Sequence, residues 1–336
     1  MKRSLILVLC LVMALSAVLV GCGTDKTGSD AGNNETAATL KFGSGVYVST
    51  PATTDATVDK DGSGKVDVTV AAVSVDADGK IVACALDTAS NTVNFTVDGK
   101  AVANTEFKTK YETGADYNMV AYGGAAKEWF EQADAFEGVV AGKTLEEVKA
   151  LVAEGDKGTD EVVNAGCTIM VAEFVSAIEK AYNAAADSKV TADHTLKVTA
   201  STEQTCSDAT IDKDGSNKVA TTVFAAAVDA DGKVVAAASD CVEVTFTFDT
   251  AGVSTLDTTK PVTTKKEAGA DYGMVAYGGA AKEWFEQAAA FDAACIGKTA
   301  SEIAGLMGED GKGVADLQSA GCTIYVTGFV KAASKI

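Results

Sequence analysis

The chain has very little arginine and histidine. Among its 336 residues, arginine occurs only at Arg3 and histidine only at His194. Bidentate guanidinium clamps on phosphate or carboxylate are therefore excluded beyond Arg3. One histidine cannot supply a His-based triad or a multi-His metal site to each of two repeats. With 28 basic against 47 acidic side chains, the net charge is −19, which favours solubility and disfavours binding to nucleic acid.

Long apolar runs are missing everywhere except at the N-terminus, so no later segment is long enough to span a bilayer. Lys2 and Arg3 precede an uncharged apolar run over residues 4–20, as in a secretory signal. The run ends in Leu-Val-Gly-Cys, which resembles a bacterial lipobox. That resemblance implies cleavage after residue 21 and a diacylglycerol group on Cys22, whose acyl chains bury CH2 groups in the bilayer at about 0.8 kcal/mol each.

These features predict a signal peptide over residues 1–21 and a polar, flexible tether over residues 22–39. Loss of Lys2 and Arg3 leaves 26 basic and 47 acidic residues, a net charge of −21. We expect the mature protein to be held by membrane lipid at the extracytoplasmic face of the cell membrane.

Cysteine gives no sign of a disulfide framework. Cys10 leaves with the signal and Cys22 carries lipid, so six thiols remain, at positions 84, 167, 206, 241, 295 and 322. Only Cys167 and Cys322 occupy matching places in the two repeats described next. Disulfides inherited by duplication would recur, so we predict mostly free thiols, as in an anaerobic exterior.

The chain contains an internal repeat. Residues 114–136 (GADYNMVAYGGAAKEWFEQADAF) recur as residues 269–291, with 21 of 23 positions identical. The landmarks DATVDKDG and DATIDKDG, VDADGK twice, and AGCTI twice extend the match. We predict two homologous repeats of domain size, 40–186 and 196–336, joined by a linker over 187–195.

Each repeat begins with a pattern typical of antiparallel strands. Residues 66–75 alternate in character, residues 76–80 (DADGK) form a turn signal, and an apolar run over 81–86 follows; TVNFTVDGK adds a further strand. The loop starting at Asp59 matches the early ligand spacing of a calcium loop, but Val70 stands where a bidentate glutamate belongs. We interpret that loop as a hairpin turn.

The second part of each repeat is helical. In the first repeat Trp129, Ala133, Phe136 and Val140 fall on one helical face. Thr144 and Glu147 have the form of a capping box, and an amphipathic helix over 168–185 closes the repeat. The predicted fold class is α+β, with two tandem domains that each place an antiparallel sheet before packed helices.

Two short motifs in each repeat could bind a ligand. The glycine pairs Gly123-Gly124 and Gly278-Gly279 precede a helix, where backbone N–H groups could hold an anion, or they only allow a close turn. The AGCT turns place Gly166 before Thr168 and Gly321 before Thr323. Each threonine is either the N-cap of the last helix or an exposed hydroxyl open to modification.

The order of hairpin, helical middle, small-Gly-small-Thr turn and closing helix resembles the FMN-binding domain of secreted bacterial flavoproteins. In that family a transferase links FMN through its phosphate to the threonine of a Ser-Gly-Ala-Thr turn, with an aspartate upstream. The resemblance implies attachment at Thr168 and Thr323. Ala165 and Ala320 stand in place of the serine, and Cys167 and Cys322 in place of the alanine. The segment YGGAAKEWFEQA is similar instead to clostridial surface lipoproteins.

The resemblance favours a lipid-tethered FMN carrier for extracytoplasmic electron transfer, which would need a redox partner at the membrane or surface. The flavin would carry the redox chemistry, with its ring flanked by the tryptophans Trp129 and Trp284 or by the tyrosines Tyr122 and Tyr277. The alternative is a flavin-free surface module that binds a small ligand, a cell-wall component or a protein. Both interpretations favour a carrier or binding protein over a catalyst, and neither predicts a metal site.

Overall fold

The computed structural model describes residues 37–104 and 106–336, so the predicted signal peptide, Cys22 and the tether up to residue 36 lie outside it. The described residues from Ala37 onward form one compact unit. No helix in this part of the chain is long and apolar enough to cross a membrane.

The first half of the unit contains a six-stranded antiparallel sheet in the order β5-β4-β3-β1-β6, with β2 paired to β3. Its strands are β1 (Leu40–Val48), β2 (Ala52–Thr54), β3 (Gly62–Val75), β4 (Ile81–Phe95), β5 (Ala101–Val102) and β6 (Ala186–Val190). Its helices are α1 (Lys110–Thr113), η1 (Gly114–Tyr117), α2 (Trp129–Val140), α3 (Leu145–Lys149), η2 (Glu154–Asp156), α4 (Asp160–Ala165) and α5 (Ala172–Asn183).

The second half repeats this order around a three-stranded antiparallel sheet, β7-β8-β9. Its strands are β7 (Thr195–Ser207), β8 (Gly215–Val228) and β9 (Val234–Phe248). Its helices are α6 (Lys265–Ala268), η3 (Gly269–Tyr272), α7 (Trp284–Cys295), α8 (Ala300–Ala304), α9 (Ala315–Ser319) and α10 (Thr327–Ala333). The predicted combination of antiparallel sheets with packed helices is confirmed.

The predicted hairpin is present and joins β3 and β4, with Gly79 at φ 78° and the Asp76 carboxylate accepting the N–H groups of Asp78 and Lys80.

Three other expectations from the sequence need correction. The two strands expected after that turn form the single strand β4. Residues 187–190 of the predicted linker belong to β6, which pairs with β1, so the linker is only in part a connection. The patterns of β1 and β6 were missed.

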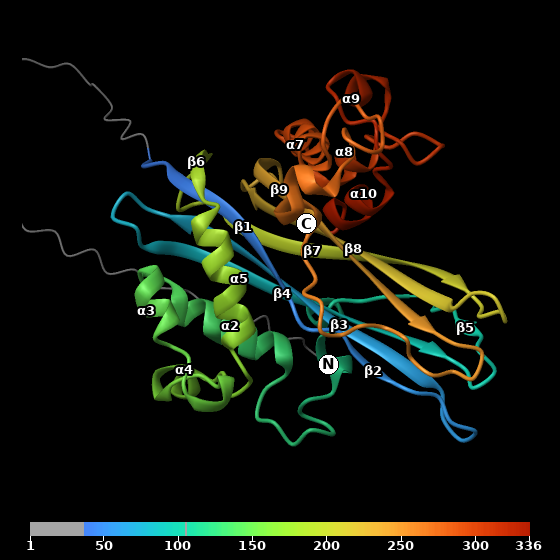
Figure 1. Cartoon of the computed structure of the whole chain (residues 1–336). Helices are drawn as coiled ribbons and strands as arrows, with labels where there is room; N and C mark the ends of the chain where they lie inside the picture. Colours follow the sequence, from blue (N-terminus) through green and yellow to red (C-terminus); the bar gives the residue numbers. More distant parts are fainter. Residues whose placement is uncertain (1–36, 105) are drawn as a thin grey trace, which may run out of the picture. The chain divides into compact units, whose positions relative to one another are not determined.

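The two sheets pack face to face, and the helices of each half cover the outer face of their own sheet (Figure 1). Strand β3 has side chains on both faces of its sheet, one face towards the helices and the other towards the second sheet. Ala71, Val73 and Val75 face helices α2 and α5, whereas Val66 and Val68 face the other sheet. Because both faces are covered, residues 68–75 are all buried, which is typical of a strand inside a layered core.

Helix α5 lies unusually close to its sheet because of two glycines in β1. A Cβ at Gly43 would overlap the carbonyl oxygen of Ala181, and a Cβ at Gly45 would overlap the backbone of the same helix. Small residues here allow backbone to approach backbone, which brings the Nζ of Lys180 within 2.9 Å of the Val46 carbonyl.

The contacts between the halves are reciprocal. The amide of Ala56 donates to the Gly252 carbonyl and the amide of Ala209 to the Gly99 carbonyl, each over 2.8 Å. The phenyl rings of Phe95 and Phe248, which end equivalent strands, stack with centroids 4.5 Å apart. Each half therefore offers the other the same set of groups.

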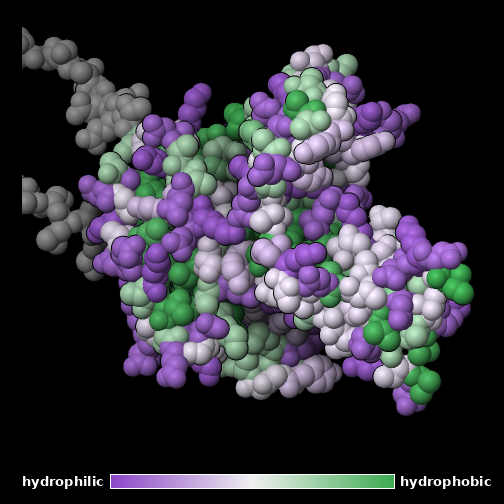
Figure 2. Space-filling view, viewed as in Figure 1, coloured by the Kyte–Doolittle hydropathy of each residue, from purple (hydrophilic) through white to green (hydrophobic). Residues whose placement is uncertain are grey.

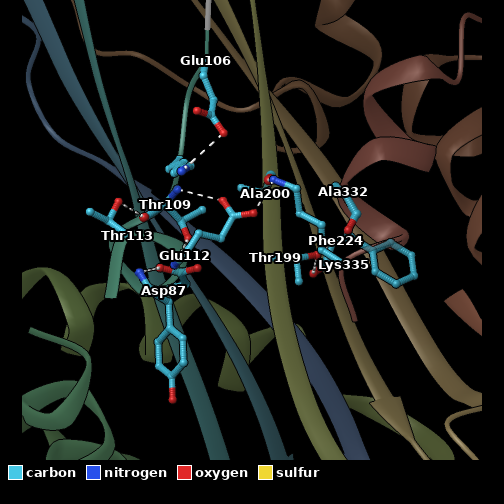
Figure 3. Close-up of polar contacts among 12 residues, drawn as sticks. Asp87, Glu106, Thr109, Glu112, Thr113, Thr199, Ala200, Phe224, Ala332 and Lys335 are labelled. Atoms are coloured by element: carbon cyan, nitrogen blue, oxygen red, sulfur yellow. Dashed lines mark hydrogen bonds and ion pairs between the residues drawn. The ribbon is translucent and has the colours of Figure 1, made fainter. Parts of the chain in front are cut away.

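Ion pairs repeat the same relation between the halves. Lys335 Nζ lies 2.7 Å from Glu112 of α1 and 2.6 Å from the Ala200 carbonyl (Figure 3). Its counterpart Lys180 pairs with Glu267 of α6 at 2.5 Å. Two cross-pairs between equivalent residues indicate an internal pseudo-twofold arrangement.

The face seen in Figure 2 mixes hydrophilic and hydrophobic residues, and some of the hydrophobic ones gather at the lower right, near the ends of the long strands. Val58 and Ile211, at equivalent positions in the two DATVDKDG-type turns, are 87% and 95% exposed. Both turns close through a backbone pair, Thr57 with Lys60 and Thr210 with Lys213, as expected of hairpins. No cluster of metal-binding side chains occurs among the described residues.

Candidate functional site

The AGCT turns are held by a buried glutamine in each half. The amide and hydroxyl of Thr168 both donate to Oε1 of Gln132, over 2.8 and 2.9 Å. Thr323 makes the same pair of bonds to Gln287, over 2.8 and 3.0 Å. The glutamines are 1% exposed, whereas both threonines are exposed. We call each pair a Gln–Thr latch, because it ties the turn to helix α2 or α7.

The expectation that these threonines cap the last helix is wrong. Helices α5 and α10 begin at Ala172 and Thr327, and their N-cap residues are Val171 and Val326. Gly166 and Gly321 instead end the preceding turn at φ 105° and 104°, where a side chain would be strained and would clash with the ammonium of Lys127 or Lys282. The left-handed backbone at both positions therefore requires glycine.

The glycine pairs form a turn, and glutamate carboxylates already lie at the start of the helix that follows. Gly124 and Gly279 have φ 67° and 66°. At the start of α2, the Glu128 carboxylate accepts the Met119 and Val120 amides over 2.9 and 3.2 Å, and the Glu131 carboxylate accepts the Glu128 amide. An anion placed here would meet two carboxylates rather than free donors, so the close-turn interpretation fits better.

This network explains much of the near-identity of the repeated stretch. In the second half Glu283 accepts the Met274 and Val275 amides, and Gln287 Nε2 donates to the Lys282 carbonyl, as in the first half. The side chains of Tyr122 and Tyr277 stand apart from it, at 88% and 92% exposed. Both tyrosines lie outside the cleft described next.

A cleft of about 680 Å³ opens in the second half between the sheet, η3, α7 and the AGCT turn. Its walls combine aromatic and aliphatic faces with charged groups and the latched threonine. The lining includes Lys265, Tyr272, Trp284, Lys312, Thr323 and Tyr325, with Glu203 and Glu243 from the sheet. The volume lies within the range of small-molecule sites.

Lys265 is the best-held charge in the cleft. Its Nζ lies 2.9 Å from Glu243 and 5.0 and 5.7 Å from the ring centroids of Tyr272 and Trp284. Burial lowers its pKa, but Cys241, Tyr272 and Glu243 outweigh burial and raise the pKa above the ordinary value. Burial likewise raises the pKa of Glu243, yet Lys265 and Lys218 bring it below its usual value. Both groups are charged at neutral pH.

The first half repeats the lysine with its two rings. Lys110 lies 5.6 Å from the Tyr117 ring and 5.5 Å from the Trp129 ring. Trp129 and Trp284 are 4% and 3% exposed and pack on Phe174 and Phe329. The tryptophans therefore belong to the core, and Trp284 also lines the cleft.

A second cavity, of about 280 Å³, lies between the halves beside the buried Asp87 and the partly buried Glu137. Glu137 accepts the Leu86 amide over 2.7 Å, and burial raises its pKa to about 8. Asp87 accepts the Thr88 and Tyr111 amides, and burial raises its pKa to about 6. Burial also raises the pKa of Asp292, the counterpart of Glu137, to about 6. Nothing in the sequence marked these carboxyls, because they lie in unremarkable strand and helix patterns.

All six thiols in the described part of the chain are free, as predicted. Burial raises the pKa of Cys167 and of Cys322 to about 11. Neither thiol is a ready nucleophile, since reactivity follows the thiolate. Their place before the latched threonines reflects packing in a tight turn.

The structure brings together Trp284, Thr323 and the loop after Gly321, and adds cleft residues that the sequence analysis missed: Lys265, Tyr272, Lys312, Tyr325 and Glu243. The recurrence of a lysine four residues before each GADY segment was the available signal for Lys265. Comparisons with protein families, with curated proteins and with solved structures found no match to this chain.

Proposed function

We propose that this protein is an extracytoplasmic, lipid-anchored binding module that takes a small aromatic molecule into the cleft of its second half. The observation that carries the proposal is the cleft itself, where Tyr272 and Tyr325 offer aromatic side chains beside a few fixed charges and the largely buried Trp284 also contributes to the wall. A mostly apolar cavity with few convergent polar groups is the usual form of a small-molecule site. The lipobox-like sequence at Cys22 supports the location.

We further propose that the chain arose by tandem duplication of one α+β domain. The support is the reciprocal bonding of equivalent residues, such as Lys335 with Glu112 and Lys180 with Glu267. A symmetric homodimer makes each contact twice in this way. Fusion of two copies would then have freed each half to change its own site.

A flavin carrier is the second candidate, and the position of Thr323 favours it. Thr323 is exposed and lines the cleft, so a phosphoester there would place FMN beside Trp284 and Tyr325. Attachment would remove the hydrogen bond from the Thr323 hydroxyl to Gln287 Oε1, whereas the hydrogen bond from the Thr323 backbone N–H to the same oxygen could remain. The flavin would supply the redox chemistry, and the protein would bind and orient it.

A titration tests binding. The chain from residue 37 with Trp129→Phe retains Trp284 as its only tryptophan, and riboflavin, FMN and anilinonaphthalene sulfonate are added while Trp284 emission is followed. We expect saturable quenching that Tyr325→Ala weakens and Tyr277→Ala, outside the cleft, leaves unchanged. Absence of saturation with all three probes would refute the binding module.

The flavin candidate has a separate test. The chain is co-expressed with a flavin transferase and its intact mass and visible spectrum are recorded. One added FMN that Thr323→Ala removes and Thr168→Ala retains would establish attachment in the cleft. An unmodified, colourless protein would reject covalent attachment.

A further inference from the structure

The two halves surround equivalent places with the same three lysines. Lys65, Lys110 and Lys157 in the first half correspond in sequence and register to Lys218, Lys265 and Lys312 in the second half. In both halves the middle lysine lies against a tyrosine and a tryptophan. The basic framework of the site is therefore common to both copies.

The acidic groups differ between the halves. In the first half, Asp67 pairs with Lys65 at 3.4 Å, and the half-buried Glu173 lies in the field of Lys110, Lys65, Asp67 and Asp156. The corresponding second-half residues are Ala220 for Asp67, Gly328 for Glu173 and Gly311 for Asp156. Three carboxylates are thus missing where the cleft opens, and both Ala220 and Gly328 line it.

Only part of the missing charge is replaced. Glu243 stands where the first half has Ser90 and pairs with both Lys218 and Lys265, at 3.0 and 2.9 Å. Glu203 is paired with Lys331 at 2.8 Å. Lys312 has no ion pair within the described residues and lies 5.6 Å from the Tyr325 ring centroid. Asp310, exposed, accepts only the Lys312 amide.

The lining charges and their ion-pair partners in the second half are therefore four lysines against two glutamates, whereas the first half sets three lysines against three carboxylates. Two lysines and two glutamates line the cleft itself, and the excess comes from Lys218 and Lys331, which pair with those glutamates from outside the lining. Such a local excess of cations stands out in a chain of net charge −19. A bound anion would restore the balance that Glu173 and its neighbours give the first half.

We propose that the ligand of the second-half cleft is an aromatic molecule with an anionic group, which lies on the Lys312 side of the cleft, where Gly328 stands in place of the Glu173 carboxylate. In the first half the carboxylate of Glu173 takes the corresponding place, so that one ligand binds per chain. The inference rests on the binding function proposed above and adds the charge of the ligand and its stoichiometry.

FMN and riboflavin test the charge, because they share one ring system and differ in the phosphate. In the Trp129→Phe chain we expect FMN to bind at least about tenfold more tightly than riboflavin, as a charge-assisted contact implies. Lys312→Met should remove this difference, and Lys213→Met, which removes an exposed lysine outside the cleft, should retain it. Equal affinity for both flavins, or equal effects of the two lysine substitutions, would overturn the inference and leave the binding module standing.

Exchange of residues between the halves tests the stoichiometry. Ala220→Asp with Gly328→Glu gives the second half two of the three acids of the first half, those at the positions that line the cleft, and should abolish FMN binding. A Cβ at residue 328 would lie 2.6 Å from Thr222 Oγ1, so circular dichroism must show a native fold, and Ala220→Asp alone serves if it does not. Asp67→Ala with Glu173→Gly should raise the FMN stoichiometry, measured by calorimetry in the chain that keeps Trp129, from one to two. Two sites in the unaltered chain would overturn the inference; failure of every aromatic probe would instead refute the binding module.

Discussion

Substitution of Glu137 by glutamine should stabilise the protein in a strongly pH-dependent way. Glu137 is partly buried beside the inter-half cavity, faces Asp134 on its own helix and Asp87 on β4, and has a pKa of about 8 where an ordinary glutamate has 4.5. Tyr111, Glu112, Lys197 and Lys335 also line this cavity. Oε1 of a glutamine can still accept the Leu86 amide that Glu137 now accepts over 2.7 Å.

The sign follows from proton uptake. The folded protein holds the Glu137 proton up to about pH 8, whereas the unfolded chain releases it near pH 4.5, so stability falls as pH rises through that interval. At about 1.4 kcal/mol per tenfold change, the full difference is about 5 kcal/mol, an upper bound. Water entering the cavity would reduce it to about 2–3 kcal/mol. Glu137→Gln removes this penalty above pH 8 and changes little near pH 5.

Urea unfolding followed by tryptophan emission measures the effect at pH 5 and pH 9, since Trp129 and Trp284 are both buried. The matched control is Glu146→Gln, the same change at a side chain that is 86% exposed. We expect the free energy of unfolding of Glu137→Gln to exceed that of the unaltered protein by at least about 2 kcal/mol more at pH 9 than at pH 5. Equal differences at the two pH values would refute the reasoning.

Three further predictions concern the latch, the ion pairs and the thiols. Gln287→Ala leaves the Thr323 backbone N–H without its acceptor and should lower the free energy of unfolding in urea by about 1–3 kcal/mol. The control Gln318→Ala, which removes a single hydrogen bond to the Gly313 carbonyl in the same half, should lower it less. A larger loss for Gln318→Ala than for Gln287→Ala would contradict the latch. A double-mutant cycle on Glu112 and Lys335 should give a coupling of about 0.5–1 kcal/mol that falls in 1 M salt, and a coupling of zero would remove the pair from the inter-half contacts. Cys167, Cys241 and Cys322 should resist a thiol reagent at pH 8 until urea unfolds the chain, because their pKa values are about 11; fast reaction in the native protein would contradict their burial.

Local signals in the sequence predicted much of each half. The Asp76–Lys80 turn, the apolar face of α2 and the Thr144–Glu147 capping box are set by residues close together in the chain, and all three are present. β4 was predicted as two strands because its polar centre, Asp87 to Thr92, resembles a break. Asp87, Thr88 and Asn91 of that centre are buried, and Asp87 accepts the Tyr111 amide of α1 while Asn91 donates to Thr221 across the halves.

The sequence by itself determined the acidic character of the protein, its internal repeat, its antiparallel strands and its amphipathic helices, because composition and short-range periodicity are enough for these. Only the tertiary structure decided that the two sheets pack together, that Gln132 and Gln287 hold the AGCT threonines, and that a cleft opens beside Lys265 and Gly328. The physical reason is distance along the chain: Gln287 and Thr323 are 36 residues apart, and Asn91 and Thr221 are 130 residues apart, so no local pattern records their contact.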